Sequence, residues 1–572
     1  MKFYFKKINL IACLFFVYYL NSHAFAKDSE FSYSREDIGN YFLGILASNE
    51  GSVKEAYKHL KKVQTLKSKH KNFNRQFIHT LVMLDRFDQA FSFSREVWQE
   101  DDLFFEADLL LGINSLIEKK YKNAEKYFLR LNRFSENNYI LDDFLGNFLI
   151  SWSRAYANDK SESFSFLNKI PTRYNNLKKI QNSFLQCYFD HAEAENVFKS
   201  LVEGEGNAFS RYNFFLINYL LRNNKDFEAK KILNDSREKY NSNLLLKQTE
   251  DFILKNKKDK IKYLFNCKNI KDNIAEIFYV IANLYSTQKN YKLSNFYLKI
   301  SIFLNNKFSP NQALLAENLF FQKKYKLSKD VYSSMKSIGP AFSWYASKNV
   351  AIILSETQGK KRSTSSLIKE FDLIENPNFE NYYEMGNFFK NNEYYKESIQ
   401  YYSLALKNIK KNHYLIPKIL DRRGTSYERL GEWSKAEKDL LKSLKILPDQ
   451  AHVLNYLAYS WIEKRINIDD ALKMLKKATK LKENDGYIID SLGWAYYVSE
   501  NYTEAEKFLQ RAVELMPLDP VINDHYADAL WMLNKNIQAR YIWKHVLTLE
   551  NIENKLKENI DKKLIYGITE KL

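Results

Sequence analysis

The sequence has few of the residues that interrupt regular secondary structure. Its 572 residues include only 15 glycines and 8 prolines, while 45% of the residues are hydrophobic. A loop-rich β architecture or a disordered chain is usually richer in glycine and proline. The composition therefore argues against both classes. It predicts a chain that is almost entirely α-helical and that can bury a large core.

Cysteine is scarce as well. The chain has 3 cysteines, and the two beyond the N-terminal region, Cys187 and Cys267, stand 80 positions apart without any Cys-x-x-Cys motif. Disulfide-rich domains and cysteine-based metal sites show more cysteines at closer, regular spacing. The sequence therefore indicates no disulfide framework.

Catalytic and metal-binding motifs are also missing. The 9 histidines are scattered, and no HExxH, phosphate-binding GxxxxGK[ST] or GxSxG motif occurs. The glycine-rich stretch "GEGNAF" (204–209) has no strand before it and fits an inter-repeat loop. Asp524, His525 and Asp528 lie close in sequence, but on a helix His525 points about 100° away from the aspartates. We interpret them as an exposed acidic face, and we predict no enzyme activity, metal or cofactor.

The N-terminus has the pattern of a secretory signal peptide. The basic stretch "MKFYFKK" precedes the apolar run "INLIACLFFVYYL", and "AFA" (24–26) has the small-x-small form of a cleavage site. We predict a signal peptide over residues 1–26, cleavage after Ala26 and a periplasmic mature chain. The alternatives are a lipoprotein acylated at Cys13 and an uncleaved anchor. The apolar run is shorter than the roughly 20 residues that span a membrane.

The charge is positive but uneven. The full chain has a net charge of +18, and residues 449–550 hold 12 Lys and Arg against 15 Asp and Glu. The basic excess therefore lies upstream, most densely in "LKNKKDKIK" (254–262). We interpret this run as a solvated helix face or a turn between helices, with an anionic surface as an alternative partner. For an exported protein, nucleic acid is not an expected partner.

A small residue recurs at steps of 34 to 38 positions along much of the chain. This first set comprises Gly44, Gly112, Gly146, Ala282, Ala316, Ala351, Gly386, Gly424, Ala458, Gly493 and Ala527, with Ile78 at one equivalent position. A second small residue follows after a turn, at Ala56, Ala90, Ala124, Ser294, Ser328, Ser398, Ala436, Ala471, Ala505 and Ala539. Such a period with two helices per unit predicts stacked helix pairs.

The repeat that contains Gly493 carries a family pattern. Leu492, Gly493, Tyr496, Ala505, Leu509, Ala512 and Pro517 follow the order of the tetratricopeptide repeat. The chain resembles this family, which implies an all-α fold, a right-handed α-solenoid of about 15 repeats. We expect degenerate repeats over 27–270, regular repeats over 271–550 and a capping helix over 551–572.

Gly493 lies inside a predicted helix, where glycine costs about 1 kcal/mol relative to alanine. We expect the two helices of this repeat to cross closely at Gly493 and Ala505. Larger residues then fill the remaining gaps, and their burial offsets the cost of the glycine. These residues are Leu492, Tyr496, Phe508, Leu509 and Val513.

The resemblance also implies that the first helix of each repeat lines a concave groove. In three consecutive repeats the predicted partner-binding residues are His452, Asn455, Tyr459, Tyr487, Asp490, Trp494, Tyr497, Asp524, Asp528 and Trp531. Aromatic rings beside carboxylates suit a peptide groove. We expect Asp490 and Asp524 to lie outside the hairpin core, so that alanine there leaves the melting temperature nearly unchanged. The alternative for Trp494 and Trp531 is packing between adjacent repeats.

These observations predict a non-enzymatic periplasmic scaffold or adaptor that binds a protein or peptide. The C-terminal block is similar to exported repeat proteins of alphaproteobacteria. It is more distantly similar to envelope adaptors of periplasmic proteases and cell-wall enzymes. The implied partner is an envelope protease or a cell-wall or outer-membrane assembly factor. Two alternatives stay open: a scaffold for polysaccharide synthesis or export, and an enzyme with a site within residues 146–270.

Overall fold

A computed structural model describes residues 34–68, 70–134, 144–203, 210–239, 243–550 and 552–568. Within these ranges the chain forms α-helices and three short 3-10 helices and no strand, which confirms the predicted all-α class. None of the described helices is both long and apolar enough to cross a membrane. The predicted signal peptide, Cys13 and the "GEGNAF" stretch lie outside the described residues.

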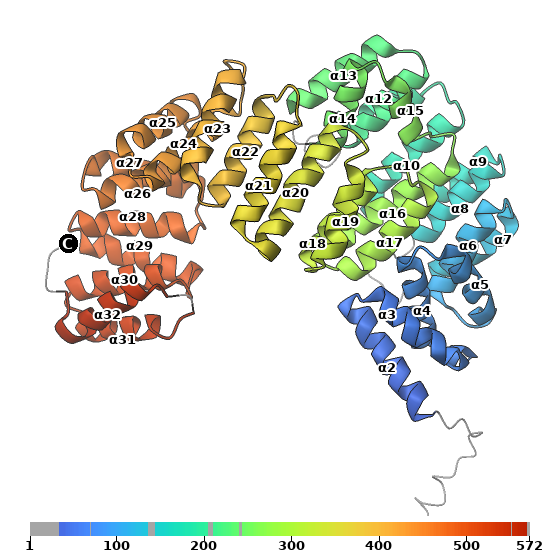
Figure 1. Cartoon of the computed structure of the whole chain (residues 1–572), viewed down its shortest axis with the longest axis horizontal. Coiled ribbons are helices and arrows are strands. Elements are labelled where there is room, and N and C mark those ends of the chain that lie inside the picture. The colour runs from blue at the N-terminus through green and yellow to red at the C-terminus, as the bar shows by residue number, and fades with distance from the viewer. Residues whose placement is uncertain are drawn as a thin grey trace, which may run out of the picture. The chain divides into compact units, whose positions relative to one another are not determined.

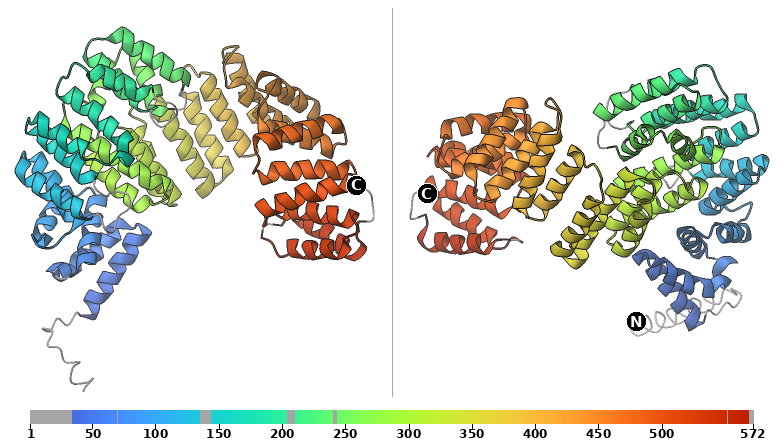
Figure 2. Two further views of the ribbon diagram at one scale, coloured as in Figure 1. Left: turned by 180° about the vertical axis from the view of Figure 1, so that it is seen from behind. Right: turned by 45° about the horizontal axis from the view of Figure 1, so that its top comes forward.

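The chain divides into two compact units between Ser363 and Thr364. From the sequence we expect degenerate repeats up to residue 270 and regular repeats after it. The boundary between the compact units lies further along the chain and does not coincide with that position, so the expected change at residue 270 stays a prediction. The helices α2 to α31 form fifteen successive pairs, and α32 follows them. This number agrees with the period of the sequence. Figures 1 and 2 show the antiparallel pairs stacked side by side within each unit.

The N-terminal unit contains the helices α2 to α20. They are α2 (Arg35–Glu50), α3 (Val53–Leu60), α4 (Lys71–Met83), α5 (Phe87–Val97), α6 (Phe105–Ile117), α7 (Tyr121–Leu131), α8 (Leu145–Tyr156), α9 (Lys160–Asn168), α10 (Asn175–Tyr188), α11 (Ala194–Val202), α12 (Tyr212–Arg222), α13 (Asp226–Lys239), α14 (Leu244–Leu254), α15 (Lys258–Leu264), α16 (Ile270–Thr287), α17 (Tyr291–Leu304), α18 (Pro310–Phe321), α19 (Tyr325–Met335) and α20 (Pro340–Gln358). Three 3-10 helices lie among them: η1 (Lys61–Ser68), η2 (Asn132–Phe134) and η3 (Thr172–Tyr174).

The C-terminal unit contains the helices α22 to α32, and α21 (Lys360–Asp372) spans the division. They are α22 (Phe379–Asn391), α23 (Tyr395–Asn408), α24 (Ile416–Arg429), α25 (Trp433–Ile446), α26 (Ala451–Glu463), α27 (Ile468–Leu481), α28 (Gly486–Val498), α29 (Tyr502–Leu515), α30 (Pro520–Met532), α31 (Asn536–Val546) and α32 (Asn554–Tyr566). The last of these lies in the segment for which we expect a capping helix.

Most first helices of a pair end in the same left-handed turn. In the Gly493 repeat, Glu500 has φ 58°, its N–H donates to the carbonyl of Tyr497, and the N–H of Asn501 donates to the carbonyl of Tyr496. This is the Schellman arrangement, which satisfies the last carbonyls of a helix. The corresponding residue is glycine at Gly431, but Lys, Asp, Asn or Glu in most other repeats. The fold thus makes its turns with very little glycine.

The small residues of the repeat mark the point where two paired helices touch. A Cβ atom added to Gly493 would lie 2.6 Å from the side chain of Leu509 and 3.0 Å from its backbone nitrogen. The same separation of sixteen positions relates Gly112 to Phe128 and Gly386 to Tyr402, at 2.2 and 2.5 Å. A methyl group does not fit at these distances. The predicted close crossing at Gly493 is confirmed, with Leu509 as the residue that fills the space.

At two of the serines in the second set, the hydroxyl contributes to the same contact. Ser294 donates to the carbonyl of Ala282 at 2.7 Å, and Ser328 donates to the carbonyl of Ala316 at 2.8 Å. Both hydroxyls are completely buried. A buried hydroxyl needs a partner, and it finds this backbone oxygen only because the helices cross so closely.

The helices α16 and α17 cover the first helices of early repeats in the N-terminal unit. α17 packs against α4 and α16 against α8 (Figure 1). Phe303 stacks on Phe87 with 4.0 Å between ring centroids, and Lys299 forms an ion pair with Asp85 at 2.7 Å. One continuous apolar core extends from Leu60 to Leu319. The first helices α4 and α8 are therefore partly covered by helices of the same unit.

A disulfide bond joins Cys187 at the end of α10 to Cys267 in the segment before α16, with the Cα atoms 6.0 Å apart. The absence of a disulfide framework, inferred from the wide spacing, is wrong for this pair. Sequence separation carries no information here, because the fold of the N-terminal unit brings the segments together. The basic run 254–262 covers the turn between α14 and α15 and part of α15, as predicted.

We expect Gly493→Leu to destabilise the C-terminal unit by about 1–3 kcal/mol or more, because the added side chain overlaps Leu509 and its backbone. Gly39 provides the matched control, since it also lies within a helix but a Cβ atom there meets nothing within 4 Å. Gly39→Ala should be neutral or stabilising by about 0.4–1 kcal/mol. Urea unfolding followed by circular dichroism compares the two. Equal effects would contradict the close crossing.

Candidate partner-binding face

The ten predicted residues lie on three consecutive first helices of the C-terminal unit. α26 carries His452, Asn455 and Tyr459; α28 carries Tyr487, Asp490, Trp494 and Tyr497; α30 carries Asp524, Asp528 and Trp531. α28 packs against α26 on one side and α30 on the other. The three helices therefore form one layer, and we call the ten residues on it the first-helix strip. Their role in binding stays a prediction.

Trp494 packs between adjacent repeats. Its indole ring stacks on Tyr497 of its own helix and on His525 of α30, with centroids 4.6 and 4.1 Å apart. The indole N–H donates to Glu463 at the end of α26, with 2.8 Å between the nitrogen and the carboxylate oxygen. Only 8% of Trp494 is exposed. This tryptophan joins three first helices, as the packing alternative predicted.

Asp490 is not free to meet a partner. Its carboxylate is 3.0 Å from Nδ1 of His525, and the aspartate is only 6% exposed. The structure thus places Asp490 in a buried contact between neighbouring repeats, and we now expect alanine there to lower stability. Removing this carboxylate would leave the buried His525 without its ionic partner, which costs several kcal/mol in comparable cases.

Asp524 and Asp528 share a face, as predicted, but that face is buried rather than exposed. The ammonium group of Lys563 on α32 lies 2.9 Å from Asp524 and 2.7 Å from Asp528. Asp528 also accepts a hydrogen bond of 3.2 Å from the indole of Trp543. The acidic face thus binds the last helix of the chain. The interpretation as an exposed face is therefore wrong. Because alanine at Asp524 removes a partner of Lys563, we now expect it to lower stability.

Two buried groups of this cluster, His525 and Asp528, have raised pKa values. Burial opposes a positive charge on His525, but the carboxylates of Asp490, Asp524 and Asp528 outweigh burial and raise the pKa of the imidazole. Burial and the neighbouring Asp524 raise the pKa of Asp528 to about 7, although Lys563 acts in the opposite direction. Among the described residues no group of three or more His, Cys, Asp or Glu is arranged to hold a metal ion.

All but one of the remaining residues of the first-helix strip are more accessible. His452 and Tyr487 are exposed, while Asn455, Tyr459 and Trp531 are half-buried. The Trp531 ring lies against Trp543, with centroids 5.5 Å apart. Tyr497 is buried under Trp494. A partner could therefore contact only some of the ten residues unless the repeats separated.

The sequence reasoning missed a cavity of about 760 Å³ beside Tyr487. Its walls come from the start of α28, the turn between α29 and α30, and the start of α32. The residues that line it are Tyr487, Leu515, Met516, Pro517, Leu518, Asp519, Pro520, Val521, Glu550, Glu553, Lys555, Leu556 and Asn559. The one signal in the sequence was "MPLDPV" (516–521), where two large apolar residues follow prolines in a turn between helices.

Comparisons with known proteins agree with the repeat. A TPR repeat-containing protein of Pseudomonas aeruginosa is 31% identical over 99 residues, which cover 17% of this chain and 17% of the relative. Together with the helix pairs and the small-residue contacts, this similarity supports a protein built from repeats of the tetratricopeptide type. Proteins of this kind generally bind other proteins.

Other similarities are more distant. A UDP-N-acetylglucosamine–peptide N-acetylglucosaminyltransferase of Giardia intestinalis is 29% identical over 223 residues, 38% of this repeat protein. The chain spans 17% and 13% of the lengths of these two curated relatives. A solved tetratricopeptide repeat protein from Parabacteroides merdae is 23% identical, with a TM-score of 0.32, and the match covers 39% of this chain and 88% of that one. No family model matches the chain.

We expect the C-terminal unit to lose stability as the pH rises from about 4 to 8. A carboxyl group whose pKa is raised by folding, from 3.8 to about 7 for Asp528, stabilises the fold fully below its unfolded pKa. That contribution is lost as the pH rises through 7, and the raised pKa of His525 acts in the same direction.

Hydrogen exchange of α30 and α32, corrected for intrinsic rates, measures this change locally. Asp528→Asn should reduce the pH dependence, because it removes the titrating group and keeps its size. The matched control is Asp469→Asn on α27, where the aspartate is exposed. If the Asp528 variant and the parent showed the same pH dependence, the pH dependence could not be assigned to Asp528.

Proposed function

We propose that this chain is a non-enzymatic scaffold in the bacterial periplasm that binds a protein or peptide through its C-terminal unit. The observation that carries the proposal is the difference between first-helix faces. In the N-terminal unit α16 and α17 cover α4 and α8, whereas α26, α28 and α30 keep His452 and Tyr487 exposed. Exposed aromatic and polar groups on a rigid helical layer suit recognition of a polypeptide.

The buried part of the first-helix strip supports this role indirectly. The contacts of Trp494, Asp490 and Asp524 fix three first helices and α32 relative to one another within the unit. A preorganised surface loses less conformational entropy when it binds. We propose that these residues position the binding surface and that the exposed residues touch the partner. An envelope protease or a cell-wall or outer-membrane assembly factor is the partner that we propose.

The disulfide supports the proposed export. Disulfide bonds form and persist in oxidising compartments such as the bacterial periplasm and are rare in the cytosol. The Cys187–Cys267 bond closes a long segment of the N-terminal unit. It therefore fits a chain that leaves the cytosol after its predicted signal peptide is removed.

We expect a photo-crosslinking amino acid at His452 or Tyr487 to form adducts with a partner in living cells, because both positions are exposed on the first-helix strip. The matched control is the same amino acid at Tyr541, which is 74% exposed on the second helix α31. Gel electrophoresis and mass spectrometry identify the adducts. Adducts only at Tyr541, or none at any of the three positions, would contradict the proposed binding face.

We expect protein recovered from the envelope fraction to begin at Lys27, to carry no acyl chain and to contain no free thiol. Intact mass measured before and after alkylation tests all three points. The full chain has only one further cysteine, Cys13, which cleavage removes. A diacylated Cys13 would identify a lipoprotein, and two free thiols would contradict the oxidised pair.

A further inference from the structure

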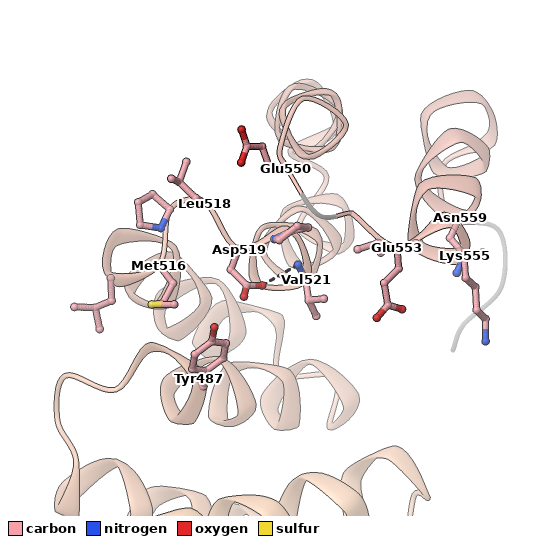
Figure 3. A pocket seen from close by; sticks show the side chains of 13 residues that line it. Tyr487, Met516, Leu518, Asp519, Val521, Glu550, Glu553, Lys555 and Asn559 are labelled. Atoms are coloured by element: carbon pink, nitrogen blue, oxygen red, sulfur yellow. Dashed lines mark hydrogen bonds between the residues drawn. The ribbon is translucent and has the colours of Figure 1, made fainter. Parts of the chain in front are cut away.

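The cavity beside Tyr487 has an apolar side open to solvent. Leu518 is 72% exposed, Tyr487 55% and Val521 45%. Figure 3 shows Tyr487 pointing towards the turn that carries Met516, Leu518 and Asp519. Turns between helices are normally polar, so large apolar residues gathered at one turn mark a contact surface. The volume of about 760 Å³ is within the range of ligand-binding clefts.

The turn that forms this side is held in place. Asp519 caps α30, because its carboxylate accepts hydrogen bonds from the N–H groups of Val521 and Ile522 at 3.0 and 3.1 Å. The side-chain amide of Asn523 donates to the carbonyl of Pro517 at 3.1 Å. Two prolines restrict the backbone further, one at each end of Leu518–Asp519. The apolar side chains are therefore presented by a preformed loop.

The other side of the cavity is acidic. Glu550 and Glu553 precede α32, and both line the cavity together with Lys555 at the start of α32 (Figure 3). Both glutamates are exposed, and within the described residues neither forms an ion pair. With Asp519, three carboxylates line the cavity against one lysine. The local charge is therefore negative on a chain whose total charge is +18.

We propose that this cavity binds a partner segment in which a large apolar side chain is flanked by lysine or arginine. The apolar side chain would contact Leu518, Val521 and the ring of Tyr487. The neighbouring cations would face Glu550 and Glu553, where opposite charge speeds encounter and disfavours acidic segments. This inference rests on the proposed function and adds the chemistry of the partner. It places an anchor at the edge of the first-helix layer, next to Tyr487.

Three labelled peptides test the proposal against the full mature chain by fluorescence polarisation. The basic apolar probe is GKKFLKKG, the acidic probe is GEEFLEEG and the probe without the apolar pair is GKKSSKKG. The first should bind at least tenfold more tightly than either of the others. Its affinity should fall as salt is added, because the glutamates are exposed.

Two double variants locate the site. Leu518→Ser with Val521→Ser should weaken binding of GKKFLKKG about tenfold, and so should Glu550→Lys with Glu553→Lys. The matched controls are Ile537→Ser, at a residue 86% exposed on α31, and Glu558→Lys on α32, neither of which lines the cavity. Both controls should bind like the parent. All four variants change exposed or partly exposed residues, and circular dichroism checks their folding.

Equal affinity for the three peptides, no binding at all, or unchanged binding by either double variant would overturn the proposal. The crosslinking experiment at His452 separates this outcome from failure of the proposed function. Adducts at His452 with no peptide binding would leave the scaffold role standing and remove the cavity as its anchor. Loss of both would reject the binding face as a whole.

Discussion

The fold depends on the close crossing of two helices within each pair. At Gly493, Gly112 and Gly386 a side chain of the opposite helix occupies the place of the missing Cβ atom. At Ser294 and Ser328 a buried hydroxyl bonds directly to the backbone of the facing helix. This contact fixes the distance between the helices of a pair. Large residues can then pack around it, and each pair can stack on the next.

A second level of organisation lies between neighbouring pairs of the C-terminal unit. Here the contacts are polar and aromatic: Glu463 with Trp494, Asp490 with His525, and Lys563 with Asp524 and Asp528. Buried charges contribute little net stability, but breaking one partner is costly. Such a series of pairs specifies how one first helix sits on the next. As a result, aspartates and aromatic residues of the kind found in binding sites here make structural contacts between helices.

Residues that look similar in sequence have different environments in this chain. Aspartates and aromatic residues recur along the first helices, yet Asp490 and Trp494 are buried in contacts between helices, whereas Tyr487 is exposed. The cavity beside Tyr487 adds a different kind of surface, built from turns and helix starts. In the N-terminal unit, α16 and α17 pack against the first helices α8 and α4, and the Cys187–Cys267 disulfide links α10 to the segment before α16.

The sequence by itself determined the all-α class, the approximate number of helix pairs and the small-residue contact at Gly493. These follow from local periodicity, because each repeat imposes the same short-range packing on its own two helices. Only the tertiary structure decided that Cys187 meets Cys267, that α16 and α17 cover early repeats, and that Asp490, Asp524 and Asp528 are buried. The ionic partners of these aspartates lie 35 or more positions away along the chain. The period of the sequence fixes which face a residue occupies on its helix, but it does not reveal what packs against that face.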